Sequence, residues 1–199
     1  MREIFGVKVL DSLEEIINPN HSVLIVWDVL RSVVDKAFNK DEFITNLNKL
    51  IEGARKVKVP IFFTKRIGLN PKFQSPALLY FYHVRLEVPL KTTEAMYAID
   101  IKDSDIIFER PSLSIFTGTN FERMLRNSGR ITIILAGIST EVGVETTARD
   151  AISRGFYAVV VEDACSSQRG KEFHDRAIQN MRYLMPVVKT NEILKIWLD

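Results

Sequence analysis

Residues 138–150 read ISTEVGVETTARD and follow an apolar run that is typical of a buried strand. A strand, a glycine turn and a helix start in this order can mount a reactive group, because the free N–H groups of a helix N-terminus bind anions. Gly143, in the position that faces the expected pocket, has no side chain. Ser139 and Thr140 offer hydroxyls for substrate binding, but no histidine precedes them to activate one, and helix capping explains them better.

Asp28 ends a second apolar run, and Arg110 ends a third β-rich segment. Ligands of open α/β sheets lie beyond the C-terminal strand ends, where the strand order reverses. If the strands before Asp28 and Gly137 are neighbours, Asp28 faces the helix that starts near Thr140. The carboxylate is then a candidate for proton transfer. The structural alternative is a helix cap or a buried ion pair with Arg110.

The other chemically capable residues are weaker candidates. Glu145 lies two positions after Gly143, about 200° around a helix, so it should point away from the same pocket. It pairs at i+4 with Arg149, although it could instead reach a partner subunit. Cys165 is interpreted as a small apolar filler. The histidines lack metal-ligand spacing and no phosphate-binding glycine motif is present, so we expect no catalytic metal and no nucleotide cofactor.

Six β-rich runs alternate with helical patterns along the chain. We expect strands at 21–28, 60–64, 104–108, 131–136, 156–161 and 186–189. We expect helices at 41–57, 119–125, from about 140, and at 171–184. This alternation predicts one α/β domain with three α/β/α layers and a mostly parallel, doubly wound sheet. Residues 1–20 form an N-terminal arm. Residues 66–100 form an aromatic-rich insertion that covers a site, contacts a subunit or packs on its own domain.

Composition narrows the class of partner. The chain has 199 residues, 46% hydrophobic content and a net charge of +2 without a basic cluster, so neither nucleic acid nor a membrane surface is expected. Its longest apolar runs are about one strand long, too short to span a bilayer. The N-terminus contains early acidic residues and no apolar leader. The single cysteine fits a reducing compartment, so the expectation is a cytoplasmic protein that acts on a small molecule.

Three segments resemble the isochorismatase-like hydrolases, a superfamily that includes cysteine hydrolases. VLIVWD, ending at Asp28, resembles the first-strand aspartate segment. FERPSLSIFTGTNFERML (108–125) resembles the segment with the catalytic lysine, and GISTEVGVETTARDA (137–151) resembles the nucleophile turn. The resemblance implies a six-stranded sheet in the order 3-2-1-4-5-6. It also implies a cis peptide at Ile138–Ser139.

The sequence departs from the family at two positions. Arg110 stands at the lysine position and Gly143 at the cysteine position. Isochorismatases proper also have glycine there and hydrolyse a vinyl ether without a covalent intermediate. The resemblance thus implies a hydrolase that uses Asp28 in acid/base catalysis, with Arg110 holding a substrate carboxylate. The alternative is an inactive member that binds a small anionic ligand. A homo-oligomer, dimer or tetramer, is expected in either case.

Overall fold

A six-stranded parallel sheet forms the centre of the computed structural model, which describes residues 1–68, 70–88 and 96–199. The strands lie in the order β5-β4-β3-β6-β7-β8 and every neighbouring pair is parallel. Their bounds are β3 Ser22–Trp27, β4 Ile61–Arg66, β5 Ile106–Arg110, β6 Thr132–Ile138, β7 Tyr157–Ser166 and β8 Val187–Val188. This order is the predicted 3-2-1-4-5-6, so the predicted fold class and topology are confirmed.

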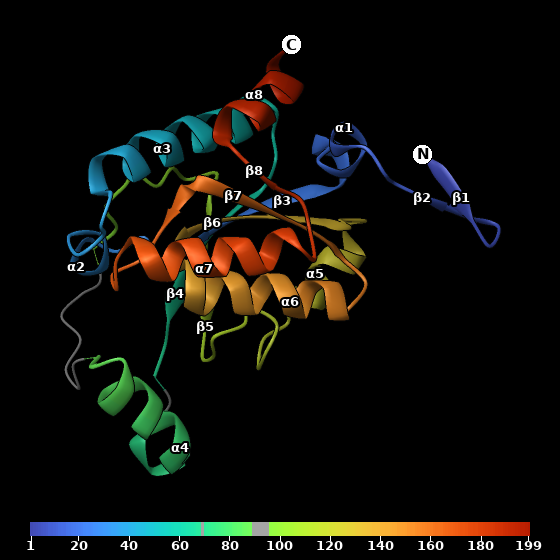
Figure 1. Ribbon diagram of the computed structural model, residues 1–199. Helices are drawn as coiled ribbons and strands as arrows, with labels where there is room; N and C mark the ends of the chain where they lie inside the picture. The colour runs from blue at the N-terminus through green and yellow to red at the C-terminus, as the bar shows by residue number, and fades with distance from the viewer. Residues whose placement is uncertain (69, 89–95) are drawn as a thin grey trace.

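Helices cover both faces of the sheet (Figure 1). One face carries α3 (Lys40–Lys56) and α8 (Thr190–Leu198), and the other carries α5 (Phe121–Asn127), α6 (Glu145–Ser153) and α7 (Lys171–Arg182). Each face has its own apolar core, because alternate residues of the buried strands point to opposite sides. Leu24 and Val26 join the α3–α8 core, whereas Val23, Ile25 and Trp27 join the α5–α7 core.

The remaining elements are short. They are β1 Arg2–Ile4, β2 Val7–Val9, α1 Leu13–Ile16, η1 Pro19–His21, α2 Arg31–Val34, η2 Pro71–Phe73, α4 Pro76–Leu79, η3 Tyr80–Arg85 and η4 Thr140–Val144. The predicted helix from residue 140 begins as the π-helical turn η4 and becomes α-helical at Glu145. The strand expected at 104–108 lies two residues later and contains Arg110. Helix α8 was not predicted, although its apolar residues fall on one face.

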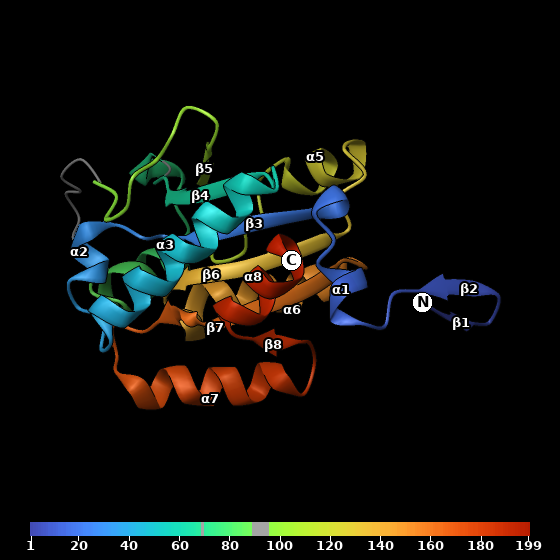
Figure 2. The ribbon, with the colours of Figure 1, turned by 90° about the horizontal axis from the view of Figure 1, so that it is seen from above.

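The N-terminal arm is a two-stranded hairpin that projects from the body (Figures 1 and 2). The side chains of Ile4, Phe5 and Val7 on it are exposed. The described part of the insertion is a helical excursion that hangs from β4 in Figure 1 and includes α4 and η3. Residues 69 and 89–95 of the insertion lie outside the described residues. Across the described ranges, no helix combines the length and the apolar character needed to span a bilayer.

Candidate functional site

Asp28 lies directly after the central strand β3, with its backbone in the left-handed region at φ 44°. Few non-glycine residues adopt this conformation, and aspartate is among the more tolerant ones. The conformation turns the chain out of the sheet at the point where the crossovers diverge to either face, which is where ligands bind in open α/β sheets. Its side chain remains 20% exposed, so solvent reaches the carboxylate.

Two neighbouring strands hold the Asp28 carboxylate. Thr64, at the end of β4, donates its hydroxyl hydrogen to Oδ1 of Asp28 at 2.8 Å and accepts the Asp28 N–H at 3.0 Å. Arg110, at the end of β5, makes an ion pair with Oδ2. Of the two structural alternatives that the sequence left open for Asp28, the structure shows the ion pair with Arg110.

The Arg110 guanidinium is almost completely enclosed, with 2% of the residue exposed. One terminal nitrogen binds Asp28 and the other donates to the Ser112 carbonyl. Its flat face stacks on the Trp27 ring, with 3.7 Å between Cζ and the ring centroid. Both terminal nitrogens and one face are therefore engaged by the protein itself, and the charge that could clamp a substrate carboxylate is already neutralised by Asp28.

Trp27 occupies the space next to Gly143. A Cβ atom added to Gly143 would lie 1.8 Å from Nε1 and 1.9 Å from Cε2 of the indole. Gly137 is equally constrained, because a Cβ there would lie 2.3 Å from the Trp27 carbonyl oxygen, and its φ of 123° disfavours other residues. Gly143 is therefore buried under the indole rather than facing open space. No side chain, and thus no thiol, fits at this position while Trp27 keeps its place.

The turn hydroxyls do not cap the helix, so that interpretation was wrong. Ser139 makes no side-chain capping bond. The buried Thr140 hydroxyl instead donates to the Ser166 carbonyl at 2.9 Å and lies 2.8 Å from Nδ1 of His174. It consequently accepts the Nδ1 hydrogen of His174, tying η4 to α7. The Ile138–Ser139 peptide preceding these residues is cis, as predicted.

Glu145 and Cys165 stand apart from the Asp28 carboxylate. Glu145 binds Arg149 through its Oε1, at 2.8 Å, which is the predicted i+4 pair. Cys165 has no exposed surface, and burial raises the pKa of its thiol far above the ordinary range, so it is not available as a thiolate nucleophile. Among the described residues, no group of three or more histidine, cysteine or acidic side chains is placed to hold a metal ion.

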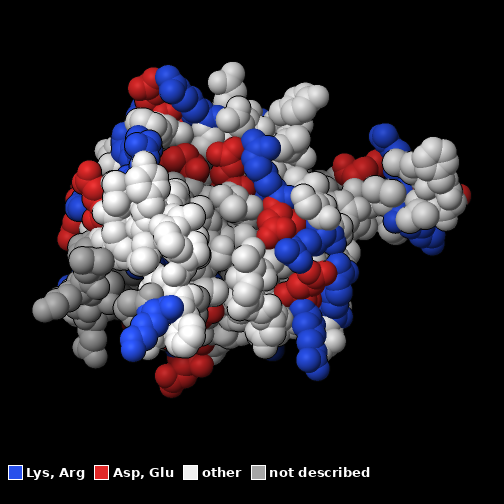
Figure 3. Space-filling view, turned by 90° about the horizontal axis from the view of Figure 1, so that it is seen from below, with Lys and Arg blue, Asp and Glu red and all other residues white. Residues whose placement is uncertain are grey.

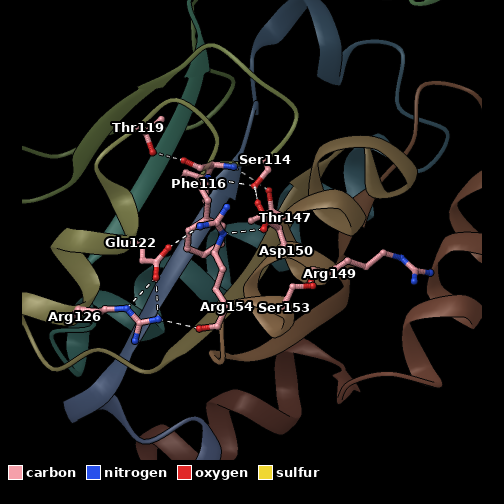
Figure 4. Close-up of polar contacts among 11 residues, drawn as sticks. Ser114, Phe116, Thr119, Glu122, Arg126, Thr147, Arg149, Asp150, Ser153 and Arg154 are labelled. Atoms are coloured by element: carbon pink, nitrogen blue, oxygen red, sulfur yellow. Dashed lines mark hydrogen bonds and ion pairs between the residues drawn. The ribbon is translucent and has the colours of Figure 1, made fainter.

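A polar network fixes the segment after Arg110 against α6 (Figure 4). Ser114 donates to Oδ2 of Asp150 at 2.5 Å, and Asp150 also binds Arg154 at 2.8 Å. Arg154 reaches Glu122 on α5 at 2.7 Å, and Glu122 in turn binds Arg126. Through the i+4 pair of Asp150 and Arg154, the network ties together α5, α6 and the segment that follows β5.

Arg66, the register partner of Arg110, lies 4.3 Å above the centroid of the Tyr82 ring. These two residues, like Trp27 and Thr64, lie beside the Asp28–Arg110 pair and were missed from the sequence. Thr64 could have been found from strand register, since β4 pairs with β3 and ends beside Asp28. Trp27 could have been found from volume, because a large residue at one strand end accompanies glycines on the neighbouring strand and turn. Tyr82 had no such signal, because it comes from the insertion.

Comparisons with known proteins identify the family. The family model of the isochorismatase domain matches residues 22–192. The isochorismatase family protein YecD of Escherichia coli O157:H7 is 30% identical over 178 residues, which cover 83% of this chain and 89% of YecD. The ureidoacrylate amidohydrolase RutB of Acinetobacter baylyi is 35% identical over 81 residues, 41% of this chain and 33% of RutB. A cysteine hydrolase from Pseudomonas syringae pv. phaseolicola has a TM-score of 0.76 at 20% identity, covering 91% of this chain and 94% of that chain. The chain belongs to the isochorismatase family.

Proposed function

We propose that this protein hydrolyses a small metabolite by acid/base catalysis at Asp28, without a covalent intermediate. The observation that carries the proposal is the combination of a turn without a nucleophile and a solvent-accessible carboxylate beside it. Trp27 fills the space beside Gly143, while the carboxylate that a proton transfer needs is retained, held by Thr64 and Arg110, and open to solvent. Relatives in the family are hydrolases, among them an amidohydrolase and a cysteine hydrolase.

In the proposed mechanism Asp28 takes a proton from a water molecule as the water attacks, and returns it to the leaving group. Arg110 keeps its own proton, because a guanidinium does not titrate near neutral pH, and it orients the carboxylate through the ion pair. Thr64 holds the other carboxylate oxygen. The carboxylate is thereby fixed in one orientation before substrate binds, which favours proton transfer.

A second candidate function is binding without catalysis. It is favoured by the internal use of both terminal nitrogens of Arg110 and by the lack of room for a nucleophile at Gly143. In that case the Asp28–Arg110 pair is structural, and a small anionic ligand is bound for a regulatory purpose. The two candidates differ in whether Asp28 is needed for turnover.

The test is an activity screen of purified protein with a panel of amides, nicotinamide and isochorismate, followed by substitution. Asp28→Ala should abolish turnover of the substrate that is found. Cys165→Ala should leave turnover unchanged, because Cys165 is fully buried. Full activity of Asp28→Ala would show that the catalytic site lies elsewhere. If no substrate of the panel reacts and Asp28→Ala only destabilises the fold, the binding function is preferred.

We also propose that the protein is a cytoplasmic homo-oligomer, a dimer or tetramer. The support is apolar surface on two projecting segments. The insertion exposes Phe73, Leu78, Tyr80 and Val84, and the hairpin exposes Ile4, Phe5 and Val7. In Figure 3 the insertion forms part of the largely uncharged surface left of centre. Such patches mark contact sites in soluble proteins. Light scattering that gives a monomer at micromolar concentration would refute this proposal.

A further inference from the structure

Several buried hydrogen-bond donors around Asp28 have no acceptor. Within the described residues, the buried side-chain atoms without a hydrogen-bond partner are Ser22 Oγ, Tyr82 OH, Tyr97 OH, Arg110 Nε, Arg130 Nε and Glu141 Oε2. Three of them belong to residues near Asp28: Arg110 binds Asp28 directly, Tyr97 forms a backbone bridge with Leu30, and Tyr82 stacks under Arg66, the register partner of Arg110. Buried polar groups are nearly always paired, so unpaired donors grouped at one carboxylate point to a missing acceptor.

Tyr82 is the donor best placed to meet a ligand. It lies on η3 of the insertion, is 4% exposed, and carries the Arg66 guanidinium 4.3 Å above its ring centroid. Arg66 is the register partner of Arg110, so Tyr82 lies at the end of the sheet where Arg110 binds Asp28. Arginine offers only donors, so its guanidinium cannot accept the phenol hydrogen. That hydrogen is left without an acceptor among the described residues.

Arg66 supplies the positive charge that Arg110 cannot. The two arginines are register partners at the ends of β4 and β5, so their side chains share one face of the sheet. Arg110 is neutralised by Asp28, whereas no ion pair involves Arg66 within residues 1–68, 70–88 and 96–199. The two guanidinium groups and one carboxylate leave a surplus positive charge on the Tyr82 side of the site.

We propose that Tyr82 and Arg66 bind a carboxylate of the substrate beside Asp28, with the Tyr82 hydroxyl as hydrogen-bond donor and Arg66 as the balancing charge. They are then the residues that select an anionic substrate, in place of the Arg110 clamp expected from the sequence. This inference rests on the proposed function, because it places the substrate within reach of the Asp28 carboxylate. It restricts the substrate class to small carboxylic acids.

Tyr97, a second buried tyrosine near Asp28, is the matched control for Tyr82. Its hydroxyl is also buried and without a hydrogen-bond partner in the described part of the chain. Its charged neighbours are the acids Asp28 and Glu109, and together with burial they raise the pKa of Tyr97 to about 12. Burial and, to a smaller extent, Asp28 also raise the pKa of Tyr82, but the cations Arg110 and Arg66 oppose that effect. A carboxylate would be attracted to the surroundings of Tyr82 and repelled from those of Tyr97.

The first experiment measures binding of benzoate, with neutral benzamide as the comparison probe. The chain has two tryptophans, Trp27 and Trp197. In the Trp197→Phe background the fluorescence comes from Trp27 alone, which stacks on Arg110 and so reports on the site. Benzoate should change the Trp27 emission saturably and benzamide should not. Adding Tyr82→Phe or Arg66→Gln should weaken benzoate binding about tenfold, as expected for a hydrogen bond to a charged group. Adding Tyr97→Phe should change it less than about twofold.

The outcomes separate this inference from the proposed function. Equal benzoate affinity in the Tyr82→Phe and Tyr97→Phe proteins, or no saturable response at all, would overturn the inference. If a substrate is hydrolysed with an Asp28 requirement but Tyr82→Phe has a normal KM, the inference fails and the hydrolase proposal stands. If benzoate binding depends on Tyr82 but no substrate is turned over, the subsite stands and the hydrolase proposal fails. Matching thermal melting curves for the two phenylalanine variants control for misfolding.

Discussion

On one side of the Trp27 indole lies Gly143, packed so closely that an added Cβ would overlap the ring. The same ring stacks on the Arg110 guanidinium, which has a buried Nε without a partner in the described part of the chain. The contact with Gly143 leaves no room for a side chain. The contact with Arg110 borders polar groups whose donors are only partly used. Trp27 thus borders a filled half of the site, at Gly143, and an open half, at Arg110.

The difference shows that one side chain can border two environments of opposite packing. In a close-packed interior a large residue and a glycine fit together, which is the case for Trp27 and Gly143. Unpaired buried donors are costly, and proteins tend to keep them where a ligand supplies the acceptor. The filled half is therefore a matter of packing, and the open half is the part of the site on which the proposed ligand binding depends.

The largest effect is expected from breaking the open half at Arg110. Arg110→Met removes the partner of Asp28 and the stacking on Trp27, and it should reduce the free energy of unfolding by about 3 kcal/mol. Chemical denaturation measures this loss. Adding Asp28→Asn should recover part of it, because the unpaired charge is then absent. Arg176→Met, which removes an exposed i+4 pair with Glu172, is the control and should cause no measurable loss. An equal loss in both variants would contradict the claim that the Asp28–Arg110 ion pair stabilises the fold.

A smaller effect is expected in the filled half, from Gly143→Ala. The new methyl group overlaps the Trp27 indole, and such overpacking should reduce the free energy of unfolding by about 2 kcal/mol. In a double-mutant cycle with Trp27→Leu, the loss for the double variant should be smaller than the sum of the single losses. Gly68→Ala is the matched control, because its new Cβ would meet nothing closer than 3.7 Å. Additive losses would mean that Trp27 is not the group that excludes a side chain at position 143.

Much of the framework could be predicted from the sequence because it follows from chain connectivity. The alternation of apolar runs and helical patterns gave a parallel sheet, and right-handed crossovers limited its order. The place of Asp28 at a strand end, with Arg110 as one candidate partner, followed from the order of the strands, and the i+4 pair at Glu145 followed from helix geometry. These are all consequences of local periodicity, which a single sequence carries.

The packing at Gly143 and the polar groups around Tyr82 could not be predicted from the sequence in the same way. Whether Gly143 faces a pocket or an indole depends on where a strand residue meets a turn more than 100 positions later, and spacing does not encode that contact. Tyr82 arrives from an insertion that lacks the strand–helix alternation. Thr140 was misread as a cap because its true partners, Ser166 and His174, lie on β7 and α7. Long-range side-chain packing decided each case.

The smallest effect is expected from His174, which supports the filled half through Thr140. Burial lowers the pKa of His174 below its ordinary value of 6.5, against the opposing charges of Asp175 and Glu162 and with a small contribution from Lys171. Below pH 6.5 the unfolded chain therefore binds a proton at His174 more readily than the folded chain does. The contribution of neutral His174 to stability is thus fully present above pH 6.5 and is lost as the pH falls toward the pKa of the folded state. His174→Asn keeps a donor for the Thr140 hydroxyl but removes the titration. The free energy of unfolding of the wild type should thus decline more steeply between pH 7 and 5 than that of His174→Asn. Parallel pH profiles for the wild type and His174→Asn would show that the histidine is not held in its neutral form by the fold.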